Sequence, residues 1–143
     1  MKRDMQIRLA GEGDLAFLAA HDRHVDAREL ARIVKQGRVL LAQMGDETVG
    51  WLRYGLFWDN TPFMNLLYVL EGARGRGVAR ALVAYWEEDM RAQGYGVVMT
   101  STASDESAQG LYRHLGYRAV GGFLPEGEPY ELIFTKRLNT NSC

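Results

Sequence analysis

The sequence predicts an α+β (α/β) protein with a sheet of mixed direction, about six or seven strands, and three or four helices. Two observations support this prediction. Short apolar runs of strand length recur along the whole chain, and amphipathic stretches of helical length lie between some of them. The chain has 143 residues, 47% of them hydrophobic and 24% charged, which is typical of one domain. We expect this domain to cover 1–138, followed by a flexible tail at 139–143.

In the N-terminal half, Gly and polar clusters separate the periodic segments. A polar stretch, His21 to His24, is expected to divide one helical region into two helices, and Gly37 to end the second. Gly45 and Asp46 form the turn of a predicted hairpin. The predicted elements are a strand at Gln6–Ala10, a helical region at Gly13–Val34, and strands at Arg38–Gln43 and Thr48–Phe57.

In the C-terminal half, a loop at Asp59–Pro62 leads into further strands and helices. They are a strand at Phe63–Leu70, a helix at Val78–Gln93 ended by Gly94, a strand at Val97–Thr100, a helix capped by Ser104 or Asp105 and ended by Gly116, and strands at Tyr117–Phe123 and Tyr130–Lys136. The stripe expected to face the core consists of Val78, Leu82, Tyr85, Trp86 and Met90, with Glu87, Glu88 and Arg91 on the other side.

Composition excludes several classes of function. The net charge of −1 argues against a nucleic-acid partner, and no apolar run is long enough to span a membrane. The N-terminus lacks the apolar segment of a signal peptide, so we expect a cytoplasmic protein. The single cysteine, Cys143, permits no internal disulfide, and three histidines without metal spacing predict no metal site.

The most informative segment is the glycine-rich turn from Arg74 to Ala79, which connects a predicted strand to a predicted helix. Unpaired N–H groups at a helix N-terminus and roughly half a positive charge from the helix dipole attract anions there. Arg74, Arg76 and Arg80 add full charges. This segment, called the phosphate loop below, therefore predicts a phosphate or pyrophosphate ligand.

Two familiar phosphate-binding patterns do not match this loop. The P-loop requires a Gly-Lys-Ser/Thr ending, which the chain lacks. Gly75 and Gly77 fit the first two positions of the dinucleotide fingerprint, but Arg80 occupies the third, and Thr100 lies where an acidic residue should hold the ribose.

A third pattern, Arg/Gln-x-x-Gly-x-Gly/Ala, is matched by Arg74, Gly77 and Ala79, and it resembles the pyrophosphate loop of the GNAT superfamily of N-acetyltransferases. Downstream, Ala108-x-x-Leu111-Tyr112-x-x-Leu115-Gly116-Tyr117 is similar to the second GNAT signature. The two motifs stand in the family's order and spacing, and the order of elements is similar from Met5 to Leu138.

The resemblance implies the GNAT fold, with a mostly antiparallel sheet, and acetyl-CoA as co-substrate. It implies that the strand before the loop splays from the next strand and offers free backbone groups to the pantetheine arm and the acetyl oxygen. An N–H group there acts as an oxyanion donor, for which Val69 is the candidate. The implied coenzyme A contacts are Tyr68, Val69, Leu70, Arg74, Gly75, Arg76, Gly77, Val78, Ala79, Arg80, Ser107 and Tyr112.

The resemblance also matches Tyr112 to the tyrosine that points at the sulfur. A phenol is protonated at neutral pH and can return a proton to a leaving thiolate, whereas the alternative is an ordinary packed aromatic ring. Asp105 departs from the asparagine that the family often has at this position, which weakens a coenzyme A contact there. Ser107 is a substitute donor.

The amine acceptor is expected at the first helices and two loops. The candidate contacts are His21, His24, Trp58, Asp59 and Glu128, with Glu126, Trp51 and Phe123 as further candidates for charge or apolar walls. The sequence does not identify the general base, for which Glu71, a histidine and a water molecule relayed through backbone carbonyls are alternatives. The resemblance implies that the acceptor is a primary amine of a small molecule, a peptide or a protein, and that a homodimer is possible, since dimers are common in the family.

Two other functions stay open at this stage. A non-catalytic acyl-CoA-binding sensor would keep the phosphate loop without transferring the acetyl group, and the departure at Asp105 leaves room for it. An oxidoreductase with a dinucleotide fold is disfavoured by Arg80 and by the residues around Thr100.

Overall fold

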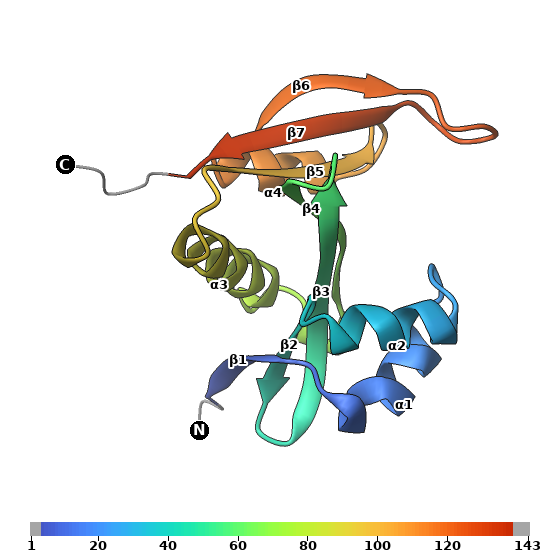
Figure 1. Ribbon diagram of the computed structural model, residues 1–143, viewed down its shortest axis with the longest axis vertical. Coiled ribbons are helices and arrows are strands. Elements are labelled where there is room, and N and C mark those ends of the chain that lie inside the picture. The colour runs from blue at the N-terminus through green and yellow to red at the C-terminus, as the bar shows by residue number, and fades with distance from the viewer. Residues whose placement is uncertain (1–3, 139–143) are drawn as a thin grey trace. The chain divides into compact units, whose positions relative to one another are not determined.

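The computed structural model describes residues 4–138 (Figure 1), so the predicted tail at 139–143, with Cys143, lies outside the described residues. The elements are, in chain order, β1 (Met5–Leu9), a 3-10 turn (Glu12–Asp14), α1 (Leu15–His21), α2 (Ala27–Lys35), β2 (Val39–Met44), β3 (Glu47–Phe57), β4 (Thr61–Val69), a 3-10 turn (Glu71–Ala73), α3 (Val78–Ala92), β5 (Val97–Ala103), α4 (Ala108–His114), β6 (Arg118–Phe123) and β7 (Glu131–Arg137).

The strands form one seven-stranded sheet in the order β1-β2-β3-β4-β5-β7-β6. β1 with β2, β2 with β3, β5 with β7 and β6 with β7 pair antiparallel. β4 and β5 pair in parallel, through Phe63 with Met99 and Met64 with Thr100. The predicted α+β class, with a mostly antiparallel sheet and four α-helices, is confirmed.

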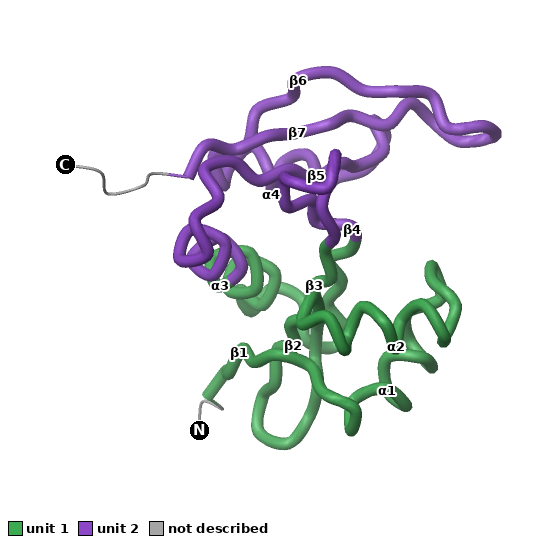
Figure 2. The backbone as a smooth tube through the Cα atoms, viewed as in Figure 1, with its two compact units in different colours: residues 1–54, 66–85 green, residues 55–65, 86–143 purple. Residues whose placement is uncertain are grey.

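The chain divides into two compact units (Figure 2). The first contains residues 1–54 and 66–85, and the second contains residues 55–65 and 86–143. β3, β4 and α3 therefore each contribute residues to both units. That residues 1–138 form a single domain stays a prediction.

The core of the first unit lies between α1, α2 and the strands β2 and β3 (Figure 1). Its buried side chains are Ala10, Leu18, Leu30, Val34, Val39, Leu41 and Trp51. The expected break in the first helical region is confirmed, because α1 ends at His21 and α2 begins at Ala27. The Asp26 side chain accepts a hydrogen bond from the Glu29 backbone N–H and so caps α2.

Asp22, between the two helices, is a buried charged residue of the first unit. Its carboxylate accepts hydrogen bonds from Nε of Arg53 at 2.7 Å and from Nε1 of Trp51 at 3.2 Å. The Asp22 and Arg53 side chains are 0% and 8% exposed. Because a buried charge is costly without a partner, this pair holds the α1–α2 connection against β3.

The core of the second unit contains Trp86, Met90, Val98, Phe134 and Tyr117. α4 packs against β7 through Tyr112, whose ring lies 5.9 Å from the Phe134 ring; the same ring lies 5.8 Å from the Tyr117 ring.

Two predicted positions on α3 were wrong. Glu87 was expected on the outer face but is 7% exposed, and Tyr85 was expected in the core but is 44% exposed. The Glu87 carboxylate accepts hydrogen bonds from the Tyr117 hydroxyl and from Nζ of Lys136, both at 2.8 Å. Burial and the negative charge of Glu87 raise the pKa of the Tyr117 phenol. The partners that bury Glu87 come from distant elements, so helical periodicity could not identify them.

The predicted helix C-termini were confirmed, whereas the predicted N-terminal cap of α4 was wrong. Gly37, Gly94 and Gly116 follow α2, α3 and α4 with φ of 75°, 97° and 95°, as a helix C-terminus requires. Ser104 and Asp105 do not cap α4, which begins at Ala108. The predicted loop at 59–62 is also shorter, since β4 begins at Thr61. In residues 4–138, no helix is long and apolar enough to cross a membrane.

Candidate active site

The phosphate loop lies in the first unit, between β4 and α3. Gly75 and Gly77 have φ of 81° and 79°, which L-residues with side chains rarely adopt. A Cβ atom added at either glycine would meet no atom within 4 Å. The glycines are therefore needed for backbone conformation, and the space beside them is open to a ligand.

The first turn of α3 offers N–H groups to that space. The first intrahelical bond runs from the Ala81 N–H to the Gly77 carbonyl, at 3.0 Å. The N–H groups of Val78, Ala79 and Arg80 precede it and have no carbonyl of the helix to bond. Because Gly77 has no side chain that could cap them, the residues present fit a pyrophosphate at this helix N-terminus.

Gly50 of β3 allows α3 to start so close to the strands. A Cβ atom at Gly50 would lie 2.9 Å from the Tyr68 carbonyl oxygen, 3.1 Å from Cγ1 of Val78 and 3.4 Å from Cδ1 of Leu82. Sequence reasoning missed this residue. A glycine inside a strand was the only signal, and it indicates a close backbone approach without naming the partner.

The three arginines of the loop are exposed, but Arg74 is anchored differently from Arg76 and Arg80. Nε of Arg74 donates to the Val69 carbonyl at 3.0 Å, and its guanidinium carbon lies 5.5 Å from the centre of the Tyr68 ring. Arg74 therefore ties the loop to the end of β4 while its charge stays beside the loop.

The end of β4 contains the backbone groups expected to serve the thioester. The Leu70 N–H donates to the Val49 carbonyl of β3 at 2.8 Å, so it is already used within the protein. N–H groups of consecutive residues in an extended strand point to opposite edges, and the Val69 N–H therefore faces away from β3. Of these two N–H groups, that of Val69 is the better oxyanion donor.

Tyr112 of α4 lies in the second unit and is 5% exposed. Burial raises the pKa of its phenol above the usual value, a hydrogen bond with Thr100 opposes this shift, and the Glu131 carboxylate raises the pKa further. The hydroxyl is therefore protonated at neutral pH, as a proton donor must be. The Thr100 hydroxyl itself donates to the Met64 carbonyl at 3.0 Å.

Three other residues considered for the donor side are exposed. Ser107 is the residue preceding α4, and its hydroxyl makes no capping hydrogen bond. Asp105 lies in the turn before it, and Glu71 begins the 3-10 turn after β4.

His21 and His24, candidates for the acceptor site, lie in the first unit and are exposed. The His21 ring stacks on Phe17 with centroids 4.1 Å apart, and its Nδ1 lies 2.8 Å from the Phe17 carbonyl oxygen. The His24 backbone N–H lies 3.4 Å from Oδ1 of Asp22. Trp51, suggested as a pocket wall, is 1% exposed and belongs to the core.

The remaining acceptor candidates, Trp58, Asp59 and Glu128, lie in the second unit. Trp58 and Asp59 form the turn between β3 and β4 with φ of 54° and 62°, and the Trp58 side chain is 80% exposed. Glu128 is exposed in the loop between β6 and β7.

The comparisons with known proteins agree with this geometry. The model of the acetyltransferase (GNAT) family matches residues 12–117, which is more than half of the chain. That range contains the phosphate loop and the second motif through Tyr117. The class of protein is therefore an acetyl-CoA-dependent acetyltransferase, and the chain belongs to the GNAT family. Comparison with curated protein sequences found no match.

Solved structures share the fold at low identity. A GNAT acetyltransferase from Bacillus cereus is 23% identical, with a TM-score of 0.77 over 95% of this chain and 99% of that one. Ard1 from Thermoplasma volcanium is 14% identical, with a TM-score of 0.82 over 94% and 98%. N-acetylglutamate synthase from Neisseria gonorrhoeae, complexed with coenzyme A and N-acetyl-glutamate, is 18% identical, with a TM-score of 0.81 over 97% of this chain and 36% of that one.

Proposed function

We propose that the protein transfers the acetyl group of acetyl-CoA directly to a primary amine of a small molecule or a peptide. The observation that carries this proposal is the helix N-terminus at Gly77. Its backbone is held in a conformation that glycine favours, its first N–H groups have no helical partner, and Gly77 has no side chain to cap them. Backbone N–H groups in this arrangement attract the negative charge of a pyrophosphate.

On the donor side, the loop residues hold coenzyme A and the end of β4 orients the thioester. Arg76 and Arg80 add positive charge near the pyrophosphate. The Val69 N–H donates to the carbonyl oxygen as negative charge develops there, which is worth about 3–4 kcal/mol in enzymes of comparable design. Tyr68 and Leu70 flank it along the pantetheine arm, and Ser107 is a further donor to coenzyme A.

In the transfer step, the amine nitrogen forms a bond to the acetyl carbon and the carbon–sulfur bond breaks. The amine loses a proton to a base or to solvent, and the sulfur leaves as a thiolate. Tyr112 then gives its phenolic proton to that thiolate. The raised pKa of the phenol means that Tyr112 carries this proton at neutral pH.

On the acceptor side, we propose that His21, His24, Trp58, Asp59 and Glu128 contact the amine substrate. His21 and His24 offer imidazole nitrogens for hydrogen bonds to the amine, whereas Asp59 and Glu128 attract a cation. The cytoplasmic location, the absence of a metal requirement and the oligomeric state stay predictions of the sequence. Among residues 4–138, no group of three or more His, Cys, Asp or Glu side chains is arranged to hold a metal ion.

The test is thiol release from acetyl-CoA with a panel of amines. We expect release that depends on both acetyl-CoA and an amine, together with a stoichiometric acetylated product by mass spectrometry. Coenzyme A binding without amine-dependent release from any member of the panel would contradict transfer and favour an acyl-CoA sensor.

A further inference from the structure

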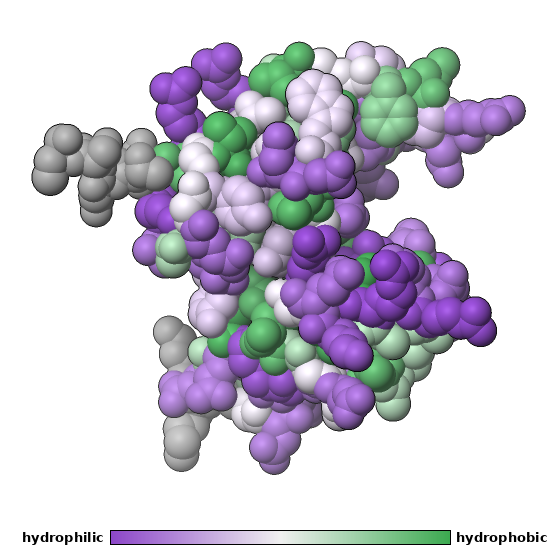
Figure 3. Space-filling view, in the orientation of Figure 1, coloured by the Kyte–Doolittle hydropathy of each residue, from purple (hydrophilic) through white to green (hydrophobic). Residues whose placement is uncertain are grey.

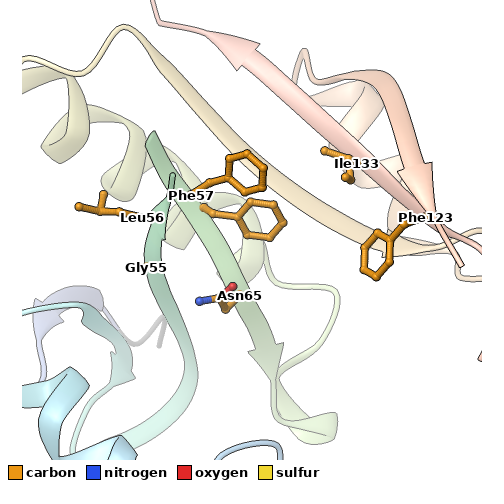
Figure 4. Close-up of a pocket in the computed structure, with 7 residues that line it drawn as sticks. Gly55, Leu56, Phe57, Asn65, Phe123 and Ile133 are labelled. Carbon is orange, nitrogen blue, oxygen red and sulfur yellow. The ribbon is translucent and has the colours of Figure 1, made fainter. Parts of the chain in front are cut away.

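A cavity of about 400 Å³ lies within the second unit (Figure 4). Its walls are largely apolar and come from β3, β4, β6 and β7. Phe57 and Phe63 stack with ring centroids 6.1 Å apart, and Phe123 and Ile133 line it from the hairpin of β6 and β7. This volume lies in the range of small-molecule sites, about 300–1,000 Å³.

One polar side chain lines this apolar space. In Figure 4 the Asn65 amide nitrogen points from β4 toward Gly55 of β3, and Gly55 makes room for it. A Cβ atom at Gly55 would lie 3.2 Å from Nδ2 of Asn65. Asn65 is exposed, so its amide is accessible to a ligand that enters the space between these aromatic side chains, where a polar group can orient the ligand.

A carboxylate lies at the edge of the cavity. Glu131 precedes Ile133 by two residues on β7 and pairs directly with Phe123 of β6, so its side chain lies on the same face of the sheet as both. The Ser101 hydroxyl donates to Oε2 of Glu131 at 2.7 Å, which fixes the carboxylate. Glu131 is half-buried, whereas Glu128, in the loop before it, is exposed.

The open side of this region is also apolar. Exposed apolar side chains gather near the end of the β6–β7 hairpin (Figure 3), where Phe123, Leu124 and Tyr130 are 52%, 72% and 44% exposed. An apolar group can therefore enter beside Phe123 without displacing charged side chains of the wall.

We propose that this cavity binds the apolar group of the acceptor and that Glu131 binds its ammonium group. The substrate class is then a primary amine that carries an aromatic or branched aliphatic group. This inference rests on the proposed function, because it names the acceptor of the same reaction. Glu131 is a specificity-determining residue that sequence reasoning did not select.

The chemistry of the lining favours this assignment over other small ligands. The lining residues include no carboxylate, so beside Glu131 the second ammonium group of a polyamine would find no partner of opposite charge among them. A carboxylate or phosphate ligand would be repelled by Glu131. A phenyl group would make apolar contacts with the walls, and one ammonium group would pair with the Glu131 carboxylate.

The experiment compares acceptors and variants in the thiol-release assay. The probes are 2-phenylethylamine, butane-1,4-diamine, ethanolamine and a tripeptide that begins with phenylalanine. The variants are Phe123→Ala, which removes one wall, and Glu131→Gln, which keeps an acceptor for the Ser101 hydroxyl but removes the charge. The controls are Val120→Ala, a 52% exposed residue of the same strand, and Glu88→Gln, an exposed carboxylate on α3.

We expect the aromatic amine or the tripeptide to have the highest kcat/KM, and the better of the two identifies the source of the acceptor. Each variant should lower that value about tenfold or more, the effect of losing a charged hydrogen bond or an apolar wall. The KM of acetyl-CoA should not change, and the controls should behave as the unaltered protein. Wild-type kcat/KM in both variants, or a preference for the diamine, would overturn the proposal.

Calorimetric titration with 2-phenylethylamine separates this proposal from the proposed function. If no amine supports thiol release but the aromatic amine binds and Glu131→Gln weakens that binding, the cavity assignment stands and the transfer reaction fails. If release occurs but neither variant changes kcat/KM, the transfer reaction stands and the cavity assignment fails.

Discussion

Replacing Gly50 with alanine tests how the phosphate loop is positioned. The new Cβ would lie 2.9 Å from the Tyr68 carbonyl oxygen, closer than side chains approach backbone oxygens in real structures. It would also meet Cγ1 of Val78 at 3.1 Å, in the first turn of α3. Either β4 or the first turn of α3 must therefore move.

The expected magnitude follows from two opposing effects. Overpacking of this kind costs about 1–3 kcal/mol. Alanine in place of glycine returns up to about 1 kcal/mol, because the unfolded chain has less conformational freedom to lose. We therefore expect Gly50→Ala to lower the free energy of unfolding by about 1–2 kcal/mol. A misplacement near 1 Å can lower an enzyme's rate about a hundredfold. We expect the same kind of displacement to lower the affinity for coenzyme A about tenfold or more.

Urea unfolding and calorimetric titration with coenzyme A measure the two effects. The matched control is Gly72→Ala, in the 3-10 turn after β4, where an added Cβ would meet no atom within 4 Å. The control should keep the unfolding midpoint and the affinity. If Gly50→Ala behaves like Gly72→Ala in both measurements, the close approach of β3 to α3 does not position the loop.

Three further predictions concern a catalytic group and two ion pairs. Tyr112→Phe should lower kcat about a hundredfold, the usual size of general acid catalysis, with little change in the KM of acetyl-CoA. Because the pKa of Tyr112 is raised, this group should cause no loss of wild-type kcat between pH 7 and 9, and full turnover in the variant would refute its role. Asp22→Asn leaves the buried Arg53 guanidinium without its counter-charge, so urea unfolding should show a loss of about 3–5 kcal/mol; a loss below 1 kcal/mol would contradict this. Hydrogen bonding to Arg8 lowers the pKa of Asp14 in the folded protein. The contribution of Asp14 to the free energy of unfolding is therefore present above the unfolded pKa near 4 and is lost as pH falls through the folded pKa. Because the pair is partly exposed, this contribution is below about 1 kcal/mol. Arg8→Met should remove this acid-side dependence of the urea midpoint, and an unchanged pH dependence would show that Asp14 does not cause it.

Much of the fold was predictable because local signals agreed with it. Gly37, Gly94 and Gly116 end helices, and the polar segment after His21 separates α1 from α2. The phosphate loop was recognisable for the same reason, since its conformation depends on glycines that are adjacent in sequence.

The errors arose where distant residues decide the outcome. Glu87 can be buried because Lys136 pairs with its charge and Tyr117 donates a hydrogen bond to it, and no pattern within α3 contains that information. Tyr85 has a hydroxyl-bearing ring at the margin of the apolar stripe, where periodicity cannot tell the core from the surface.

The donor side of the candidate site has a local signal in the sequence. Backbone N–H groups need a particular turn, and the turn has a sequence signature in Gly75 and Gly77. The acceptor site that we propose is made from side chains that strand register brings together, such as Phe123 with Glu131. Register was not readable from the sequence, so the sequence analysis named Glu128 as a candidate and did not consider Glu131.

The central claim is that the loop from Arg74 to Ala79 binds the pyrophosphate of coenzyme A. Calorimetric titration with acetyl-CoA, coenzyme A and NADH at one fixed salt concentration tests it most directly. The claim predicts micromolar binding of acetyl-CoA and coenzyme A and no comparable binding of NADH. Failure of both coenzyme A compounds to bind the folded protein would contradict it.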